Sequence, residues 1–127
     1  RHWATAPLGE PWLAGATGPN SFASGGLVRY AFRERHGFDR PAVTERERES
    51  FTAIRLAAKA GNWHPVQGDA KADDIVLMRS TVKLHCGVVV AALGGFGVLH
   101  CMDGLGVVFE KYADATRGMT AELWRRQ

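Results

Sequence analysis

The chain has 127 residues, of which 46% are hydrophobic and 23% are charged, a composition that fits one globular domain. Its 16 basic and 13 acidic residues leave a net charge of +3, which is compatible with an anionic polymer as partner. No basic stripe interleaved with aromatic residues favours nucleic acid, and no apolar run approaches the about 18 residues of a membrane span.

The first half of the chain is expected to hold an irregular arm and then helices. Residues 1–19 are rich in Gly, Pro, Ala and Trp without a sustained period, which predicts an arm anchored by Trp3, Trp12 and Leu13. Residues 20–62 form the helical part, in which the first helix is expected to begin near Phe22 and to end at His36, before a glycine.

Ser24 stands at the N-terminal tip of this first helix. Counting from it at helical spacing, four apolar residues fall on one face: Leu27, Val28, Ala31 and Phe32. Free N–H groups and a partial positive charge at such a tip suit a nucleophile or a bound anion. Gly25 and Gly26 weaken the helix, which indicates close approach of another backbone. The same Ser-Gly-Gly is also an ordinary loop-to-helix transition, and the local pattern leaves both interpretations open.

A second helix is expected over residues 44–60, where Thr44 and Glu47 form a capping-box pattern. From residue 73 onward the pattern changes to that of strands, expected at 75–78, 84–92, 98–102, 106–110 and 121–126. Helices followed by strands indicate an α+β fold with helices on one face of an antiparallel sheet. The chain is thus expected to be a single domain over residues 1–127, with the sheet in residues 73–126.

Two histidines lie inside predicted strands. If Gly94-Gly95 forms the turn between those strands, His100 lies opposite Val89, and His85 and His100 share a face. Two imidazoles aimed at a helix tip suit a base and the group that orients it. The alternative is that both are core histidines, each satisfied by a hydrogen bond.

Cys86 and Cys101 are the two cysteines, too few for a disulfide framework. Each follows a histidine directly, so a zinc site made by the four side chains is a competing interpretation. Because adjacent residues on a strand point to opposite faces, this spacing disfavours a shared metal. The same alternation directs both thiols away from His85, so neither is expected to act as the nucleophile.

Four segments resemble the NlpC/P60 family of cell-wall peptidases, in order and over nearly the whole chain. Residues 18–30, with 37–41 after them, resemble its first helix, especially in the branch found in phage tails and tail-like particles. Residues 73–79 resemble its first core strand, and residues 84–89 its His-Val-Gly-Ile/Val-Val strand. Residues 98–101 resemble its Val-Leu-His-Ala strand.

This resemblance implies a papain-like NlpC/P60 fold and hydrolysis of an amide bond in the stem peptides of peptidoglycan, at D-Glu–diamino acid linkages as in relatives. It places Ser24 at the nucleophile position, His85 as base and His100 as orienting residue, with backbone N–H groups near Ser24 in the oxyanion hole. It implies no metal and no organic cofactor. Trp12 stands where the family often has a tyrosine.

The chain departs from the family pattern at the nucleophile. Ala23-Ser24-Gly25 stands where Asp-Cys-Trp is usual, and a serine hydroxyl is a far weaker nucleophile than a thiol. We therefore expect a weak or inactive enzyme. An inactivated variant, a natural pseudoenzyme and a serine enzyme are the three explanations.

The leading hypothesis is a peptidoglycan hydrolase of a phage or phage-like tail tip, which acts in the periplasm or cell wall beside other tail-tip proteins. The alternatives are a catalytically dead structural tail-tip module and a secreted antibacterial amidase effector.

Overall fold

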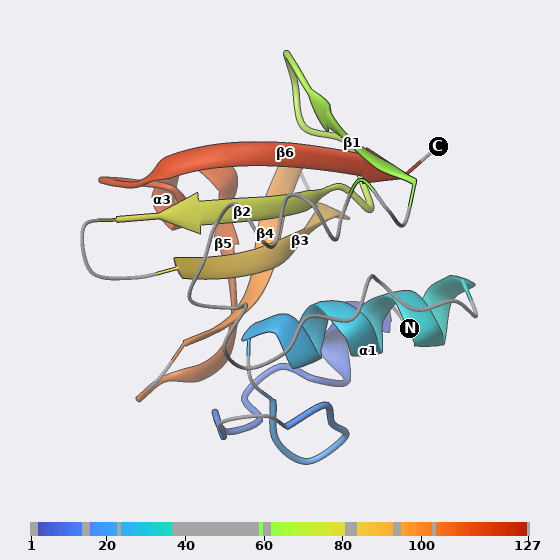
Figure 1. Cartoon of the computed structure of the whole chain (residues 1–127). Coiled ribbons are helices and arrows are strands. Elements are labelled where there is room, and N and C mark those ends of the chain that lie inside the picture. Colours follow the sequence, from blue (N-terminus) through green and yellow to red (C-terminus); the bar gives the residue numbers. More distant parts are fainter. Residues whose placement is uncertain are drawn as a thin grey trace.

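The computed structural model describes residues 3–13, 16–22, 24–36, 59, 62–80, 84–92, 95–102 and 104–126 (Figure 1). Six strands form one antiparallel sheet in the order β1-β6-β2-β3-β4-β5. They are β1 (Trp63–Val66), β2 (Ile75–Arg79), β3 (Leu84–Ala92), β4 (Gly95–Met102), β5 (Gly106–Lys111) and β6 (Thr120–Arg126). The described helices are η1 (Trp3–Thr5), α1 (Ser24–His36) and α3 (Tyr112–Ala115).

All five expected strands are present, and β4, which begins three residues before the predicted start at residue 98, differs most. The sequence pattern predicted neither β1 nor α3. Pro65 lies within β1, which is possible because β1 is an edge strand that needs no donor on one side. The four residues of α3 are too few for a helical period. The helix expected at 44–60 lies outside the described residues, except for helical Lys59.

The apolar stripe of α1 packs against the sheet as the helical spacing predicted. Its members are all at most 2% exposed: Leu27, Val28, Ala31 and Phe32. Phe32 meets Trp63 of β1 edge to face, with ring centroids 5.0 Å apart. Figure 1 shows α1 running along one side of the sheet below β3. No helix among the described residues is long and apolar enough to cross a membrane.

Close backbone approach explains one of the two glycines in α1. A Cβ added to Gly26 would overlap the Ala16 carbonyl and lie 3.1 Å from Thr17 Cα. The backbone that approaches the helix here therefore belongs to the arm of the same chain, at Ala16 and Thr17.

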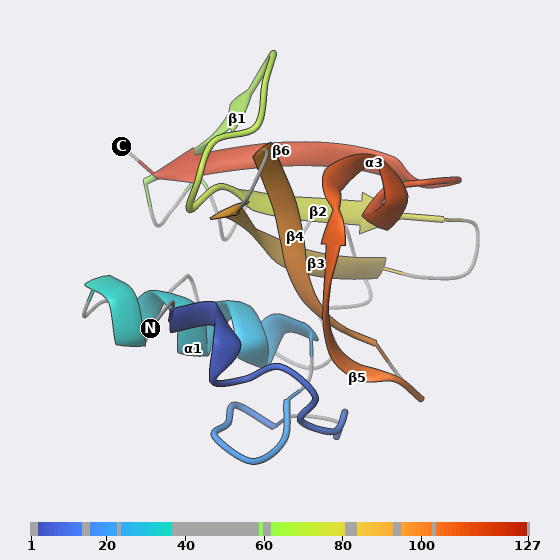
Figure 2. The ribbon, with the colours of Figure 1, turned by 180° about the vertical axis from the view of Figure 1, so that it is seen from behind.

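The two faces of the sheet carry separate apolar clusters. The stripe of α1 packs with Val88, Leu99 and Cys101 on one face. Val89 and Val98 belong to the cluster on the other face, together with Ala115 of α3. Seen from behind, β4 and β5 run steeply across the direction of β2 and β6, so the sheet is strongly twisted (Figure 2).

The arm before α1 is anchored at the edge of the sheet. Gly9 N–H donates to the Val107 carbonyl at 3.0 Å, and Val107 N–H donates to the Glu10 carbonyl at 2.9 Å, which covers the start of edge strand β5. Trp3 and Trp12 pack against the core as predicted. Leu13 is 58% exposed, so the prediction that it anchors the arm is wrong.

A buried ion pair joins the start of β2 to the end of β6. Asp74 is fully buried and accepts from Arg125 Nε at 2.7 Å and from its Nη2 at 2.8 Å. The Lys71 backbone N–H donates to the same carboxylate at 2.9 Å. Every oxygen of this buried charge thus has a partner, which is what allows it to be buried.

We predict that Asp74→Asn lowers the free energy of unfolding by about 1–3 kcal/mol, because a buried carboxylate that accepts three hydrogen bonds becomes a neutral amide that cannot accept all of them. Urea unfolding measures the difference. Asp114→Asn is the matched control, because it removes the exposed Asp114–Arg117 pair, and it should change stability by less than about 0.5 kcal/mol. Equal losses in both variants would contradict the role of Asp74.

Candidate active site

The register between β3 and β4 determines how the two histidines meet. His100 pairs with Gly87 rather than with Val89, because Ala92 pairs with Gly95 and Gly95 is therefore part of β4. The predicted pairing was wrong by two residues. A shift of two preserves the alternation of side chains, so His85 and His100 still share one face, as predicted.

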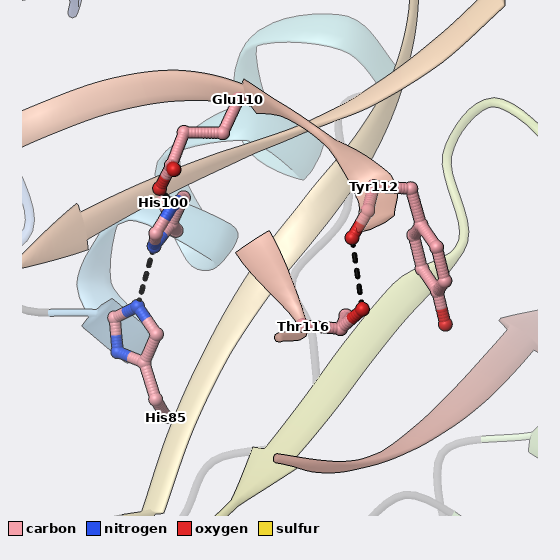
Figure 3. Close-up of polar contacts among 5 residues, drawn as sticks. All are labelled: His85, His100, Glu110, Tyr112 and Thr116. Carbon is pink, nitrogen blue, oxygen red and sulfur yellow. Dashed lines mark hydrogen bonds and ion pairs between the residues drawn. The ribbon is translucent and has the colours of Figure 1, made fainter. Parts of the chain in front are cut away.

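A chain of polar contacts runs diagonally across three adjacent strands. His85 Nε2 lies 2.7 Å from His100 Nδ1, and His100 Nε2 lies 2.8 Å from Glu110 Oε1 (Figure 3). The two imidazole rings meet edge to face at 69°, with centroids 5.0 Å apart. His100 is 2% exposed and His85 is half-buried, so the outer imidazole is supported by an inner one.

Gly87 provides the space in which His100 reaches His85. A Cβ at this position would lie 2.6 Å from Val98 Cγ1, 2.9 Å from the Leu99 carbonyl oxygen and 3.1 Å from His100 Cβ. Any side chain there would displace β4 or tilt the His100 ring. The close packing of β4 against Gly87 therefore requires a glycine at this position.

Glu110 is the member of this site that the sequence reasoning missed. It lies on β5 two residues beyond Val108, the partner of His100, and therefore on the same face as His100. The sequence did place Glu110 in a correctly predicted strand, on the same face as Val108. Without the β4–β5 register, that carboxylate could not be matched to a histidine.

The position of Ser24 is described only through the backbone. Ser24 is the first residue of α1, and its side chain lies outside the described residues. The chain just before α1 is attached to β4, because Cys101 Sγ donates to the Phe22 carbonyl at 3.1 Å. The start of α1 is thus connected to the residue next to His100. The stripe of α1 packs on the sheet face opposite the imidazoles.

Both cysteines are free thiols on the face away from the imidazoles. Burial raises the pKa of the Cys101 thiol from 9.0 to about 11. A buried thiol with that pKa is neutral at ordinary pH and does not act as a nucleophile. The opposite directions of the thiols and the imidazoles also separate the four proposed zinc ligands. No group of three or more His, Cys, Asp or Glu within the described part of the chain is arranged to hold a metal ion.

Helix α3 closes the end of β5 beside the site without joining it. Thr116 Oγ1 donates to the Tyr112 carbonyl at 2.9 Å, and the Tyr112 ring points away from the imidazoles (Figure 3). Burial, and then the nearby charge of Asp74, raise the pKa of the Tyr112 hydroxyl. Its surroundings are those of the cluster around Ala115 rather than of the histidine pair.

The fold is similar to that of a known hydrolase domain. The NlpC/p60 domain of the peptidoglycan hydrolase SagA superposes with a TM-score of 0.63 at 23% sequence identity, over 94% of this chain and 91% of that chain. Neither a protein-family model nor a curated protein matches the sequence. The chain therefore has an α+β fold of the NlpC/p60 type.

We predict that Cys101 resists alkylation in the native protein, because a rise of its pKa from 9.0 to about 11 lowers the thiolate population at pH 8 by about 100-fold. Cys86→Ala leaves Cys101 as the single thiol, and mass spectrometry follows its reaction with iodoacetamide. The unfolded variant is the control and should react at the rate of an ordinary thiol. Equal rates in the folded and unfolded protein would show that Cys101 is exposed.

We predict that Gly87→Ala destabilises the protein by about 1–3 kcal/mol, because the new methyl group overlaps Val98 and the β4 backbone. Denaturant unfolding measures the loss. In a double-mutant cycle with Val98→Ala, the double variant should lose less than the sum of the single variants, because the second change removes one of the clashing atoms. Strict additivity would mean that the two positions do not compete for space.

Proposed function

We propose that this protein is a peptidoglycan-directed amide hydrolase with Ser24 at the nucleophile position, His85 as base and His100 as the residue that orients it. The observation that carries the proposal is the His85–His100 contact of 2.7 Å, on a fold of the NlpC/p60 type. In that arrangement one imidazole takes a proton from the nucleophile while the other fixes its ring.

The two histidines divide these roles by their positions. His85 uses Nε2 toward His100, so its Nδ1 is the ring atom that takes the proton. His100 is buried between His85 and Glu110 and is placed to orient its neighbour. This assignment agrees with the roles that the family resemblance implies.

The nucleophile position rests on the family resemblance of residues 18–30 and on the place of Ser24 as the first residue of α1. A helix of 13 residues begins at Ser24, and its first N–H groups lack partners within the helix. Such groups stabilise the negative charge that develops on a carbonyl oxygen under attack. Because serine replaces a thiol in a site of this kind, we propose that activity is weak or absent in this chain.

The fold and the net charge support the proposed substrate class. The structurally similar domain belongs to a peptidoglycan hydrolase, and a net charge of +3 suits an anionic wall polymer. We propose the stem peptides as the cleaved part. The setting in a phage or phage-like tail tip, with other tail-tip proteins as partners and the periplasm or cell wall as the place of action, rests on the resemblance of residues 18–30 and 37–41. A secreted antibacterial effector is the alternative setting.

Ser24 also supports a second candidate, a structural tail-tip module that keeps the fold and has lost catalysis. In such a module the imidazole pair serves only to stabilise the strands.

We predict that Ser24→Cys raises the release of peptide fragments from purified peptidoglycan by about tenfold or more, because a thiolate is the stronger nucleophile beside an imidazole. Mass spectrometry of soluble fragments measures the rate. Ser21→Cys is the matched control, because it adds a thiol three residues earlier and should leave the rate unchanged.

His85→Ala in the Ser24→Cys background should return the rate to that of the starting protein, because the base is lost. A folded Ser24→Cys protein without activity would reject Ser24 as the nucleophile position and favour the structural module.

A further inference from the structure

We infer that Glu110 is a positioning residue that sets the tautomers of both imidazoles and thereby leaves His85 Nδ1 as a proton acceptor. The inference deepens the proposed function and rests on it for the role of His85. Its basis is the order of the three groups: carboxylate, buried imidazole and outer imidazole, joined at 2.8 Å and 2.7 Å.

The argument begins at the carboxylate. An ionised carboxylate can only accept a hydrogen bond, so its contact at 2.8 Å requires the proton of His100 to be on Nε2. In the neutral ring, His100 Nδ1 is then an acceptor. The contact of 2.7 Å between His100 Nδ1 and His85 Nε2 therefore requires the proton of His85 to be on Nε2. Nδ1 of His85 is left with its lone pair, which is the form that a general base needs.

Without the carboxylate, this order is lost. His100 could carry its proton on Nδ1, and His85 would then present the Nε2 lone pair and hold its own proton on Nδ1. That tautomer cannot take a proton at Nδ1. Because His100 is buried, water does not compete freely for its ring nitrogens, and its neighbours in the protein therefore determine its tautomer.

The proton transfer balances without any further group. The O–H bond of the nucleophile breaks as the Nδ1–H bond of His85 forms, and later the same proton passes to the leaving amine. His85 is cationic in between, and its Nε2–H still donates to neutral His100. Glu110 keeps its negative charge throughout and stabilises the cation through the intervening ring.

Glu110 is also placed to act without being required for the fold. Its side chain is 37% exposed, and it lies on β5, at the edge of the sheet. Removing its charge should therefore change the hydrogen bonds of His100 more than the packing of the core. This makes the role of Glu110 separable from a structural one.

The test is the tautomer of each ring, read by long-range proton–nitrogen NMR on the 127-residue chain labelled with ¹⁵N-histidine at pH about 8. We expect Nε2–H at both His85 and His100. Glu110→Gln should produce a mixture of tautomers at both rings, because an amide can either donate to His100 Nε2 or accept from it, and His100 passes the change to His85.

Glu122→Gln is the matched control, because Glu122 is also a partly buried glutamate on a strand and accepts from Trp124 Nε1 at 3.1 Å. It should leave both tautomers unchanged. Thermal unfolding of all three proteins checks the fold, and Glu110→Ala gives a second reading if the glutamine variant unfolds. Unchanged tautomers in both folded Glu110 variants would overturn the inference.

The measurement needs no turnover, so its failure differs from a failure of the proposed function. An inert Ser24→Cys protein would reject the hydrolase while leaving the tautomer result intact. If Ser24→Cys is active, adding Glu110→Gln should lower kcat about ten- to a hundredfold with little change in KM. The loss should be smaller than the whole contribution of general acid–base catalysis, which is about 10²–10⁴-fold, because His85 is still present. An unchanged kcat would show that the tautomers set by Glu110 do not affect catalysis, and it would contradict the positioning role.

Discussion

The backbone pairing of β3, β4 and β5 is the constraint on which the site depends. Because side chains alternate along each strand, this register places three polar groups on one face and directs both thiols to the other. His100 lies on the central strand of the three and contacts a residue of each neighbouring strand. A one-residue shift between β3 and β4 would turn the two imidazoles to opposite faces, and one between β4 and β5 would turn Glu110 away from His100.

The surrounding structure maintains that register in two ways. Apolar clusters on both faces hold the central strands between α1 on one side and α3 on the other. The pair of Asp74 and Arg125 ties β2 to β6 on one side of these three strands, and the arm pairs with Val107 of edge strand β5 on the other. Polar contacts thus fasten the strands on both sides of the group, while the apolar clusters provide most of the burial.

The function proposed here follows from the order of acceptors along one line of side chains. The Glu110 carboxylate can only accept a hydrogen bond, so it sets the position of the proton on His100, and His100 in turn sets the position of the proton on His85. In the proposed function Ser24, the first residue of α1, takes the nucleophile position, where a thiol would be the stronger nucleophile. In that proposal the two imidazoles and the carboxylate are already in contact, and the serine is the weaker part of the site.

The sequence by itself determined the positions of β2, β3, β5 and β6, the buried stripe of α1 and the shared face of the two histidines, because the periods of helices and strands are local. The tertiary structure alone decided that Gly87 faces His100, that Gly26 meets the arm and that Glu110 completes the site. It also decided the pairing of Asp74 with Arg125, which are far apart in the chain. These contacts depend on register, twist and long-range docking, which no local period specifies.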